Sequence, residues 1–150
     1  MASLLGIAFS NASRAPMETV EQVEITVEKG VGQEFRRGVE GLQITVLVKE
    51  AWGDACADLG KDLHWTVRRA NLLVDELDLM ESTGNLIRIG DTVLEITGET
   101  LPCPRMDEQK QGLTQALEPF WRAGVTCNVV EGGAIRVGDK VKVERTVSAG

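Results

Sequence analysis

Apolar and polar residues alternate along much of this chain, and this pattern is typical of strands with one buried face. The clearest case is residues 20–28, where Val and Ile are interleaved with Glu, Gln and Thr. β-Branched residues suit such a half-buried strand. The same reasoning predicts strands at residues 4–9, 43–48, 70–74, 86–89, 92–97, 125–130, 134–137 and 140–146. Gly, Asp or Asn borders many of these segments, so we expect short strands joined by tight turns.

Two segments instead predict helices that would plug or flank a β-barrel. The first covers residues 49–59, with Gly60 as the expected C-terminal cap. The second covers residues 107–120, and Pro119 is expected to end or kink it. Its apolar positions at helical spacing are Leu113, Leu117 and Phe120. The predicted fold class is therefore mostly β, with these two helices at the periphery.

One short sequence occurs twice. Residues 87–93 read Ile-Arg-Ile-Gly-Asp-Thr-Val, and residues 135–141 read Ile-Arg-Val-Gly-Asp-Lys-Val. Each copy predicts a strand, a tight Gly-Asp turn and a second strand, with Gly supplying the positive φ that the turn needs. We therefore expect two β-hairpins.

The length of the chain fits one domain over residues 1–150, because domains of about 100–150 residues bury a sufficient core. The chain carries 23 acidic and 16 basic residues, for a net charge of −7. General binding to nucleic acid or to an anionic membrane relies on an excess of Lys and Arg, so neither is expected. No apolar stretch approaches the roughly 18 residues of a membrane span, and the N-terminus does not resemble a signal peptide. We expect a cytoplasmic protein.

The three cysteines, Cys56, Cys103 and Cys127, are irregularly spaced and form no CxxC or His-rich metal pattern. Reduced thiols, as in the cytosol, are the simplest interpretation. Cys56 lies in the first predicted helix and Cys127 in an alternating strand. We expect both to be buried and to form no disulfide bond.

Cys103 differs from the other two because a proline stands on each side of it. The prolines restrict the backbone and keep this cysteine out of a helix. Arg105 follows two residues later, and a nearby positive charge raises the fraction of thiolate, the form that binds metals and attacks sulfur. The pattern fits a metal ligand or a persulfide carrier, and it also fits a small buried residue in a rigid turn.

Two arginine pairs are further candidates for a binding site. Arg36 and Arg37 follow a glycine-rich turn, and Arg68 and Arg69 precede a predicted strand. Arginine pairs can hold phosphate or carboxylate through bidentate hydrogen bonds; the alternative is that they are solvated turn charges. His64 has no adjacent partner for a triad or a metal site, so we expect it to be structural. No GxGxxG, Walker A, HExxH or GxSxG pattern occurs, which excludes the simplest nucleotide-binding and hydrolase functions.

The joint order of several motifs resembles the MOSC (molybdenum cofactor sulfurase C-terminal) family over about residues 15–143. The motifs are Ala15-Pro16-Met17-Glu18, Gly30-Val31-Gly32 with Phe35-Arg36, Arg68-Arg69-Ala70-Asn71-Leu72-Leu73-Val74, Ile89-Gly90-Asp91 with Leu94-Glu95-Ile96, Pro102-Cys103, and Gly132-Gly133-Ala134-Ile135 with Gly138-Asp139. The resemblance implies a closed or nearly closed β-barrel of the MOSC or pyruvate-kinase-barrel type. It also implies a cleft that contains Cys103.

In family members that bind the molybdenum cofactor (molybdopterin), the corresponding cysteine is a ligand of the metal and basic residues hold the pterin phosphate. By position, the resemblance makes the cofactor-binding candidates Arg36, Arg68, Arg69, Asn71 and Cys103. For other members it implies a sulfur carrier with a persulfide on the cysteine. Small stand-alone bacterial members resemble oxidoreductases that reduce N-hydroxylated compounds.

Three functions are open at this point. The chain is a molybdenum-dependent oxidoreductase component with Cys103 as metal ligand and catalytic residue, a sulfur carrier through Cys103, or a barrel that binds a partner without chemistry. The first needs a separate electron-donor reductase, because the chain has no flavin, haem or iron–sulfur motif. The second needs a cysteine desulfurase, which links the family to pyridoxal phosphate enzymes. We expect a monomer.

Overall fold

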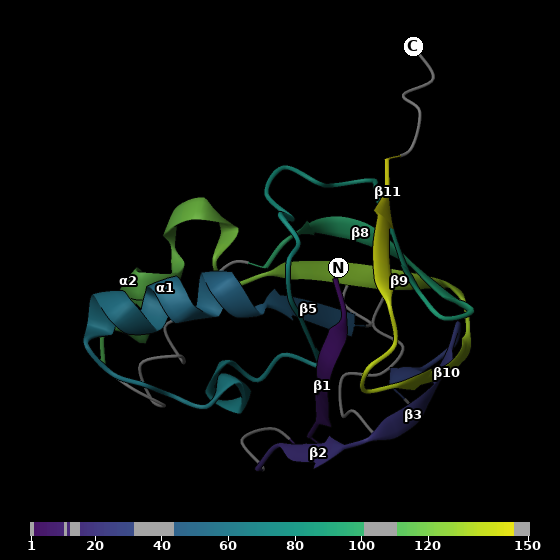
Figure 1. The fold of residues 1–150 in the computed structure, drawn as a ribbon, viewed down its shortest axis with the longest axis horizontal. Helices are drawn as coiled ribbons and strands as arrows, with labels where there is room; N and C mark the ends of the chain where they lie inside the picture. Colours follow the sequence, from purple (N-terminus) through teal and green to yellow (C-terminus); the bar gives the residue numbers. More distant parts are fainter. Residues whose placement is uncertain (1, 11, 13–15, 32–43, 101–110, 146–150) are drawn as a thin grey trace.

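The computed structural model describes residues 2–10, 12, 16–31, 44–100 and 111–145, and Figure 1 shows their arrangement. Strands dominate, which confirms the prediction of a mostly β fold. The strands are β1 (Leu4–Phe9), β2 (Glu18–Val20), β3 (Gln22–Thr26), β4 (Gly30–Val31), β5 (Ile44–Val48), β6 (Leu72–Val74), β7 (Leu86–Ile89), β8 (Thr92–Glu99), β9 (Val125–Glu131), β10 (Gly133–Arg136) and β11 (Val141–Glu144). The helices are α1 (Lys49–Leu59) and α2 (Leu113–Leu117), and 3₁₀ turns lie at Trp65–Arg68 and Pro119–Trp121.

The strands form an eight-stranded sheet in the order β11-β7-β8-β9-β5-β6-β1-β2 and a three-stranded sheet in the order β10-β3-β4. Neighbouring strands are antiparallel except β5 and β6, which run parallel with Val46 opposite Leu72. A parallel pair needs a crossover connection. Here α1 begins directly after β5 and supplies the first part of that crossover.

The described strands do not close into the barrel that the resemblance implied. β11 and β2 are the edges of the large sheet, and the small sheet is separate. In the part of the chain that the structure describes, the start of β1 and the start of β11 are joined by a single isolated bridge, between Ser3 and Lys140. β10 precedes β11 in the chain but pairs with β3. The barrel expectation is therefore wrong in its closure, because the strands divide between two sheets.

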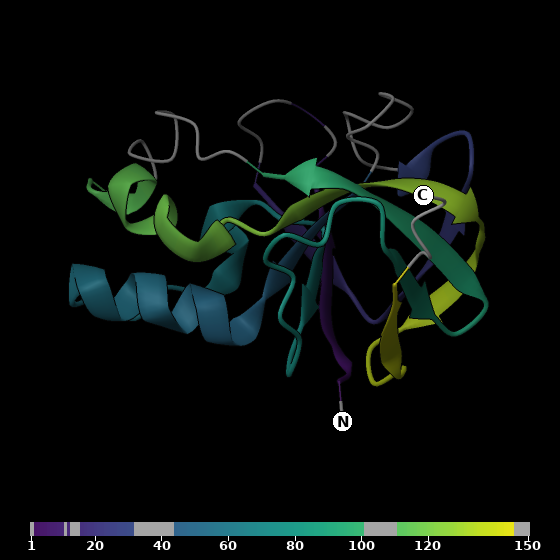
Figure 2. The same cartoon turned by 90° about the horizontal axis from the view of Figure 1, so that it is seen from above.

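Both faces of the large sheet are covered at β5, where all five residues are buried. Ile44, Val46 and Val48 belong to one apolar cluster, shared with β1, β7, β8 and β9. Leu47 belongs to a second cluster, which packs α1 and α2 against the sheet. Side chains alternate between the two faces of a strand, and this alternation produces the division. The two helices lie together at one end of the molecule (Figure 2).

The first predicted helix is confirmed. α1 spans Lys49–Leu59, and Gly60 ends it with left-handed angles of φ 68° and ψ 27°. The predicted strands are confirmed with small shifts at their ends, except that residues 20–28 do not form one strand. β2 ends at Val20 and β3 begins at Gln22. Among the described residues, neither helix has the length and apolar content needed to cross a membrane.

The second predicted helix is shorter than expected, and it is interrupted at Pro119 as predicted. α2 covers Leu113–Leu117, and the predicted residues 107–110 lie outside the described part of the chain. Leu113 and Leu117 are buried as expected, but Phe120 is exposed. The left-handed φ of 57° at Phe120, directly after Pro119, breaks the helical path and turns this side chain away from the core.

Both copies of the repeated sequence contain the expected turn, with φ 57° at Gly90 and φ 102° at Gly138. The first copy is a hairpin, in which β7 pairs with β8 and Ile89 lies opposite Thr92. The second copy is not a hairpin, so that prediction is wrong. β10 pairs with β3, while β11 pairs with β7.

Candidate functional site

The candidate site begins at the short connection between the 3₁₀ turn Trp65–Arg68 and β6. The His64 side chain caps this turn by accepting a hydrogen bond from the backbone N–H of Thr66 at 3.3 Å, in agreement with its expected structural role. The turn ends at Arg69, which has a left-handed φ of 63°. A positive φ is uncommon for a residue with a side chain, and such residues concentrate at turns and functional sites.

Arg68 is buried, with only 6% of its surface exposed. Its Nε donates a hydrogen bond of 2.9 Å to the carbonyl oxygen of Ala123, a residue 55 positions away. Removing a charge from water is costly unless polar partners replace the water. Arg68 therefore brings a fixed positive charge to the segment that leads into β9.

Asn71 joins three strands through its side chain. Its Oδ1 accepts from the backbone N–H of Thr45 at 3.0 Å, and its Nδ2 donates to the carbonyl oxygen of Ala8 at 3.2 Å. The amide thereby links β1 and β5 at the start of β6. Both ends of the amide bond to the backbone of neighbouring strands, so the observed contacts of Asn71 are structural.

A row of polar side chains, which we call the polar track, continues from Asn71 across the large sheet. Thr45 lies opposite Thr126 in the pairing of β5 with β9. The hydroxyls of Thr126 and Thr97 are 2.7 Å apart between β9 and β8. The three threonines were missed by sequence reasoning, although a threonine within an otherwise apolar strand was the available signal. The track consists of Asn71, Thr45, Thr126 and Thr97.

Arg68 and the residue after β8 contact consecutive residues of the segment before β9. The backbone N–H of Thr100 donates to the carbonyl oxygen of Gly124 at 2.9 Å, and the preceding residue, Ala123, is the one that Arg68 contacts. The hydroxyl of Thr100 is buried and has no hydrogen-bond partner in the described structure. Gly124 is required here, because a Cβ would lie 2.1 Å from the carbonyl oxygen of Val46.

Cys56 and Cys127 are unpaired and buried, as predicted. Burial, together with the nearby carboxylate of Glu95, raises the pKa of the Cys127 thiol far above its usual range, so this thiol stays protonated and unreactive. Within the described ranges, no cluster of three or more His, Cys, Asp or Glu side chains could hold a metal ion.

Comparison with known protein families gives this arrangement its context. The MOSC domain family matches residues 35–142, which is most of the chain. The chain belongs to the MOSC domain family. The resemblance seen in the sequence motifs is thereby confirmed.

Solved structures share the fold of this MOSC protein. They include the YUAD protein from Bacillus subtilis, at 17% identity and TM-score 0.85 over 98% of each chain. YiiM from Geobacillus stearothermophilus has 16% identity and TM-score 0.77, over 99% of this chain and 78% of that chain. YiiM from Escherichia coli has 12% identity and TM-score 0.72, over 97% of this chain and 71% of that one. Such low identities show the fold alone. No protein with a curated description matches the sequence.

The predicted site residues of this MOSC protein divide into two groups. Arg68, Arg69 and Asn71 lie together around the start of β6. Arg36 and Cys103 lie outside the described residues. Cys103 follows Thr100 by three positions, and three residues span at most about 11 Å. Thr100, the last described residue before Cys103, bonds to Gly124, and Arg68 bonds to the preceding residue, Ala123.

Proposed function

We propose that this MOSC protein is a cytoplasmic molybdenum-cofactor-binding component of an oxidoreductase. Cys103 is the proposed metal ligand and catalytic residue, and a separate reductase is the proposed electron donor. The reaction removes oxygen from an N-hydroxylated substrate, so that R–NHOH, two electrons and two protons give R–NH₂ and water. The observation that carries the proposal is that Arg68 and Thr100 bond to consecutive residues, Ala123 and Gly124, and that Thr100 stands three residues before Cys103 in the sequence.

The described residues fit a phosphate-bearing cofactor. Arg68 brings a guanidinium group to Ala123, Arg69 follows it in the chain, and guanidinium is well suited to phosphate recognition. The buried hydroxyl of Thr100 has no hydrogen-bond partner in the described part of the chain. A buried polar atom without a partner is costly, and a ligand oxygen would remove that cost.

Each residue has a distinct role in the proposal. When bound, the cofactor would supply oxygen-atom transfer chemistry. Arg69 and Thr100 would hold the phosphate by donating hydrogen bonds, together with Arg36 from the other arginine pair. Arg68 is held by Ala123 and contributes positive potential. Cys103 binds metal as the thiolate and so releases its proton, which makes metal retention weaker at low pH.

A sulfur-carrier role for Cys103 is the second candidate function. The supporting observation is that Cys56 and Cys127 are both buried, so they are poor acceptors of sulfur from another protein. In this role the Cys103 thiolate attacks the outer sulfur of a cysteine desulfurase persulfide. Cys103 gains the persulfide and the desulfurase leaves as a thiolate.

One preparation tests both candidates. The full chain is purified as a monomer from a host that makes molybdopterin, and molybdenum content and intact mass are measured. We expect the wild type to retain molybdenum and Cys103→Ser to lose at least about tenfold of it, as for the loss of a metal ligand or its support. Cys56→Ser is the matched control and should retain the metal. A reducible mass increase of one sulfur atom without molybdenum would instead indicate the sulfur carrier.

Arg69→Asn tests the phosphate site without a change of backbone, because Asn tolerates a left-handed conformation. Loss of a charge-assisted hydrogen bond should weaken retention of the cofactor by about 1.5–3 kcal/mol. A protein with neither molybdenum nor extra sulfur, and with no effect of Cys103→Ser, would indicate a barrel-like binding domain without chemistry.

A further inference from the structure

Three consecutive residues before β9 each contact a distant part of the chain. Arg122 contacts the two helices through its side chain, and Ala123 accepts the hydrogen bond from Arg68 at 2.9 Å. Gly124 accepts the bond from the backbone N–H of Thr100, also at 2.9 Å. Because the three residues are joined directly in the chain, a contact that fixes the first also restrains the backbone to which Arg68 and Thr100 bond.

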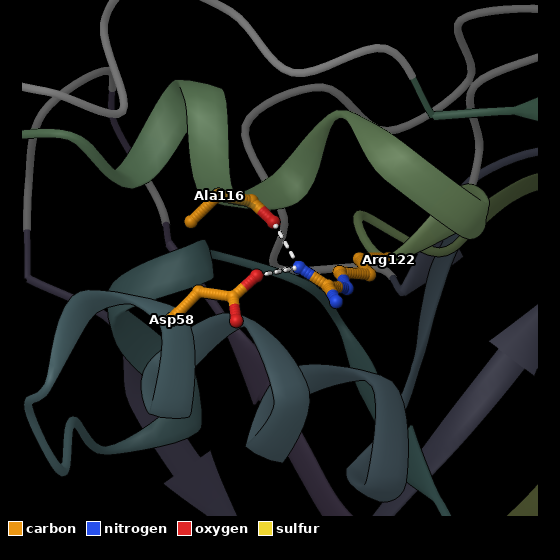
Figure 3. Close-up of polar contacts among 3 residues, drawn as sticks. All are labelled: Asp58, Ala116 and Arg122. Carbon is orange, nitrogen blue, oxygen red and sulfur yellow. Dashed lines mark hydrogen bonds and ion pairs between the residues drawn. The ribbon is translucent and has the colours of Figure 1, made fainter.

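The side chain of Arg122 is tied to both helices. Its Nη1 donates to Asp58 Oδ2 on α1 at 2.5 Å and to the carbonyl oxygen of Ala116 on α2 at 3.1 Å, as Figure 3 shows. The Arg122 side chain is only 12% exposed, whereas that of Asp58 is 58% exposed. A guanidinium with little access to water depends on its polar partners more than a solvated one does. Asp58 therefore supplies a charged partner that keeps Arg122 between the helices.

The turn that leads into Arg122 is under backbone strain. Phe120 and Trp121 both have a φ of 57°, in the left-handed region that side chains disfavour. The backbone N–H of Arg122 donates to the carbonyl oxygen of Pro119 at 3.1 Å, and that of Gly124 donates to the carbonyl oxygen of Trp121 at 3.0 Å. Strain of this kind persists only where surrounding contacts hold it. The contacts of Arg122 with the helices hold this turn at its C-terminal side.

Stability alone does not account for Arg122. Its Nε is buried and has no hydrogen-bond partner among the described residues. A buried donor without a partner costs stability, and the strained turn before it adds to that cost. Residues that break local rules in this way are expected where function requires a particular geometry. The geometry that Arg122 secures is that of the two residues after it, Ala123 and Gly124.

We infer that Asp58 and Arg122 position the proposed phosphate site from outside it. The inference rests on the proposed function, in which Arg68 and Thr100 belong to that site. Asp58 holds Arg122, and Arg122 restrains the backbone that accepts the bonds from Arg68 and Thr100. A binding site needs its groups held by such supporting contacts, because small displacements weaken binding. Asp58 and Arg122 are therefore positioning residues and do not touch the ligand.

Hydrogen exchange, measured by NMR on the full chain, tests the structural step and needs no cofactor. The reporters are the Nε–H of Arg68 and the backbone N–H of Thr100, which bond to Ala123 and Gly124. We expect Asp58→Ala to speed exchange at both reporters by about three- to tenfold, because it removes a charge-assisted hydrogen bond whose acceptor is partly solvated. Amides of the β7–β8 hairpin should not change, whereas a general loss of stability would speed exchange there as well.

Binding of inorganic phosphate to the same proteins tests the step to the site by its sign. Removal of an acidic charge alone would strengthen the binding of an anion. Loss of positioning should instead weaken it, and we expect Asp58→Ala to raise the dissociation constant by about two- to fivefold, as for the loss of a partly exposed ion pair. Asp54→Ala is the matched control, because Asp54 is exposed on α1 one turn before Asp58 and carries the same charge. Asp58→Glu keeps the carboxylate and should restore most of both effects.

Unchanged exchange at both reporters in Asp58→Ala overturns the inference, as does phosphate binding that becomes equally tighter in Asp58→Ala and Asp54→Ala. Molybdenum retention by the wild type tests the proposed function separately. Faster exchange confined to the two reporters, in a protein whose wild type binds neither phosphate nor molybdenum, would support the positioning role and contradict the proposed function.

Discussion

Residues 87–93 and 135–141 are nearly identical in sequence, but they have different places in the fold. In the first copy, β7 and β8 pair across the turn at Gly90. In the second copy, β10 and β11 leave the turn at Gly138 for different sheets. The similar sequences therefore specify similar turns, but they do not specify that the flanking strands pair.

Contacts with β1 account for the difference. The backbone N–H of Gly138 donates to the carbonyl oxygen of Leu4, and the N–H of Leu4 donates to that of Asp139, both at 2.8 Å. The Asp139 carboxylate also accepts from the backbone N–H of Arg136 at 2.9 Å. The second turn is thus held by a strand more than 130 residues away. Such a contact decides pairing in a way that local residue preferences cannot.

The two turns also lie side by side. A Cβ on Gly90 would be 3.6 Å from Asp139 Oδ2, and a Cβ on Gly133 would be 3.7 Å from the Cβ of Asp91. The hairpin therefore packs against the corner between the two sheets. Substitutions at equivalent positions of the two copies measure how much each turn contributes.

The largest difference between the two copies is expected for substitutions at the residue before each turn glycine. Ile89 is fully buried, whereas Val137 is only partly buried. We expect Ile89→Ala to lower the free energy of unfolding by about 2–5 kcal/mol through the lost transfer energy and the cavity, and Val137→Ala to cost clearly less. Urea denaturation monitored by circular dichroism measures both. Equal costs would show that the two copies are equally important to the core.

Alanine at the turn glycines should have a smaller effect. The φ of 102° at Gly138 lies outside the left-handed region that other residues can reach, whereas the φ of 57° at Gly90 lies inside it. Gly138→Ala should cost about 1–2 kcal/mol and Gly90→Ala less. Space does not explain the difference, because no atom lies within 4 Å of a Cβ at Gly138. Thermal unfolding measures the melting temperature of each variant. A lower melting temperature for Gly90→Ala than for Gly138→Ala would contradict this reasoning.

Alanine substitutions at the aspartates of the two turns should differ in their cost to stability by about the free energy of one hydrogen bond. Asp139→Ala removes the bond to the backbone of Arg136 and should cost about 0.5–1.5 kcal/mol. Asp91→Ala should be close to neutral, since the Asp91 carboxylate makes no such bond to the described residues. Chemical denaturation of both variants makes the comparison, and a larger loss at Asp91 would be inconsistent with it.

The smallest effect is expected at the exposed arginines. Arg88 pairs with Glu144 at 2.7 Å, and Arg136 donates to the uncharged Gln22 at 3.0 Å. Arg88→Ala should cost no more than about 1 kcal/mol, because both partners are solvated. Its cost should fall as salt is added, whereas the cost of Arg136→Ala should not. Unfolding curves at low and high salt test this, and an equal response to salt would refute it.

Much of the local structure could be predicted from the sequence. The alternation of apolar residues located most strands, and helical spacing with Gly60 located α1. Local geometry also made the burial of Cys56 and Cys127 predictable, because each occupies an apolar position of its element. Phe120 was expected to continue a helix because of its spacing from Leu113 and Leu117. The left-handed backbone at Phe120, directly after Pro119, breaks that spacing.

The candidate site shows the opposite case. The arginine pair at 68 and 69 was recognisable as a candidate, but its contact with Ala123 joins residues 55 positions apart. The threonines of the polar track come from three strands that are neighbours only in the folded sheet. A short sequence pattern cannot indicate that residues so far apart in the chain become neighbours in the fold.

The sequence by itself therefore determined the strands, the first helix, the positive φ of the two turn glycines and the family. Each depends on residues within a few positions of one another or on motif order. Tertiary structure decided which strands pair, that the sheets stay open, and that Arg68 and Thr100 bond to consecutive residues before β9. These outcomes depend on contacts between distant segments, whose free energy is gained only when the whole chain packs.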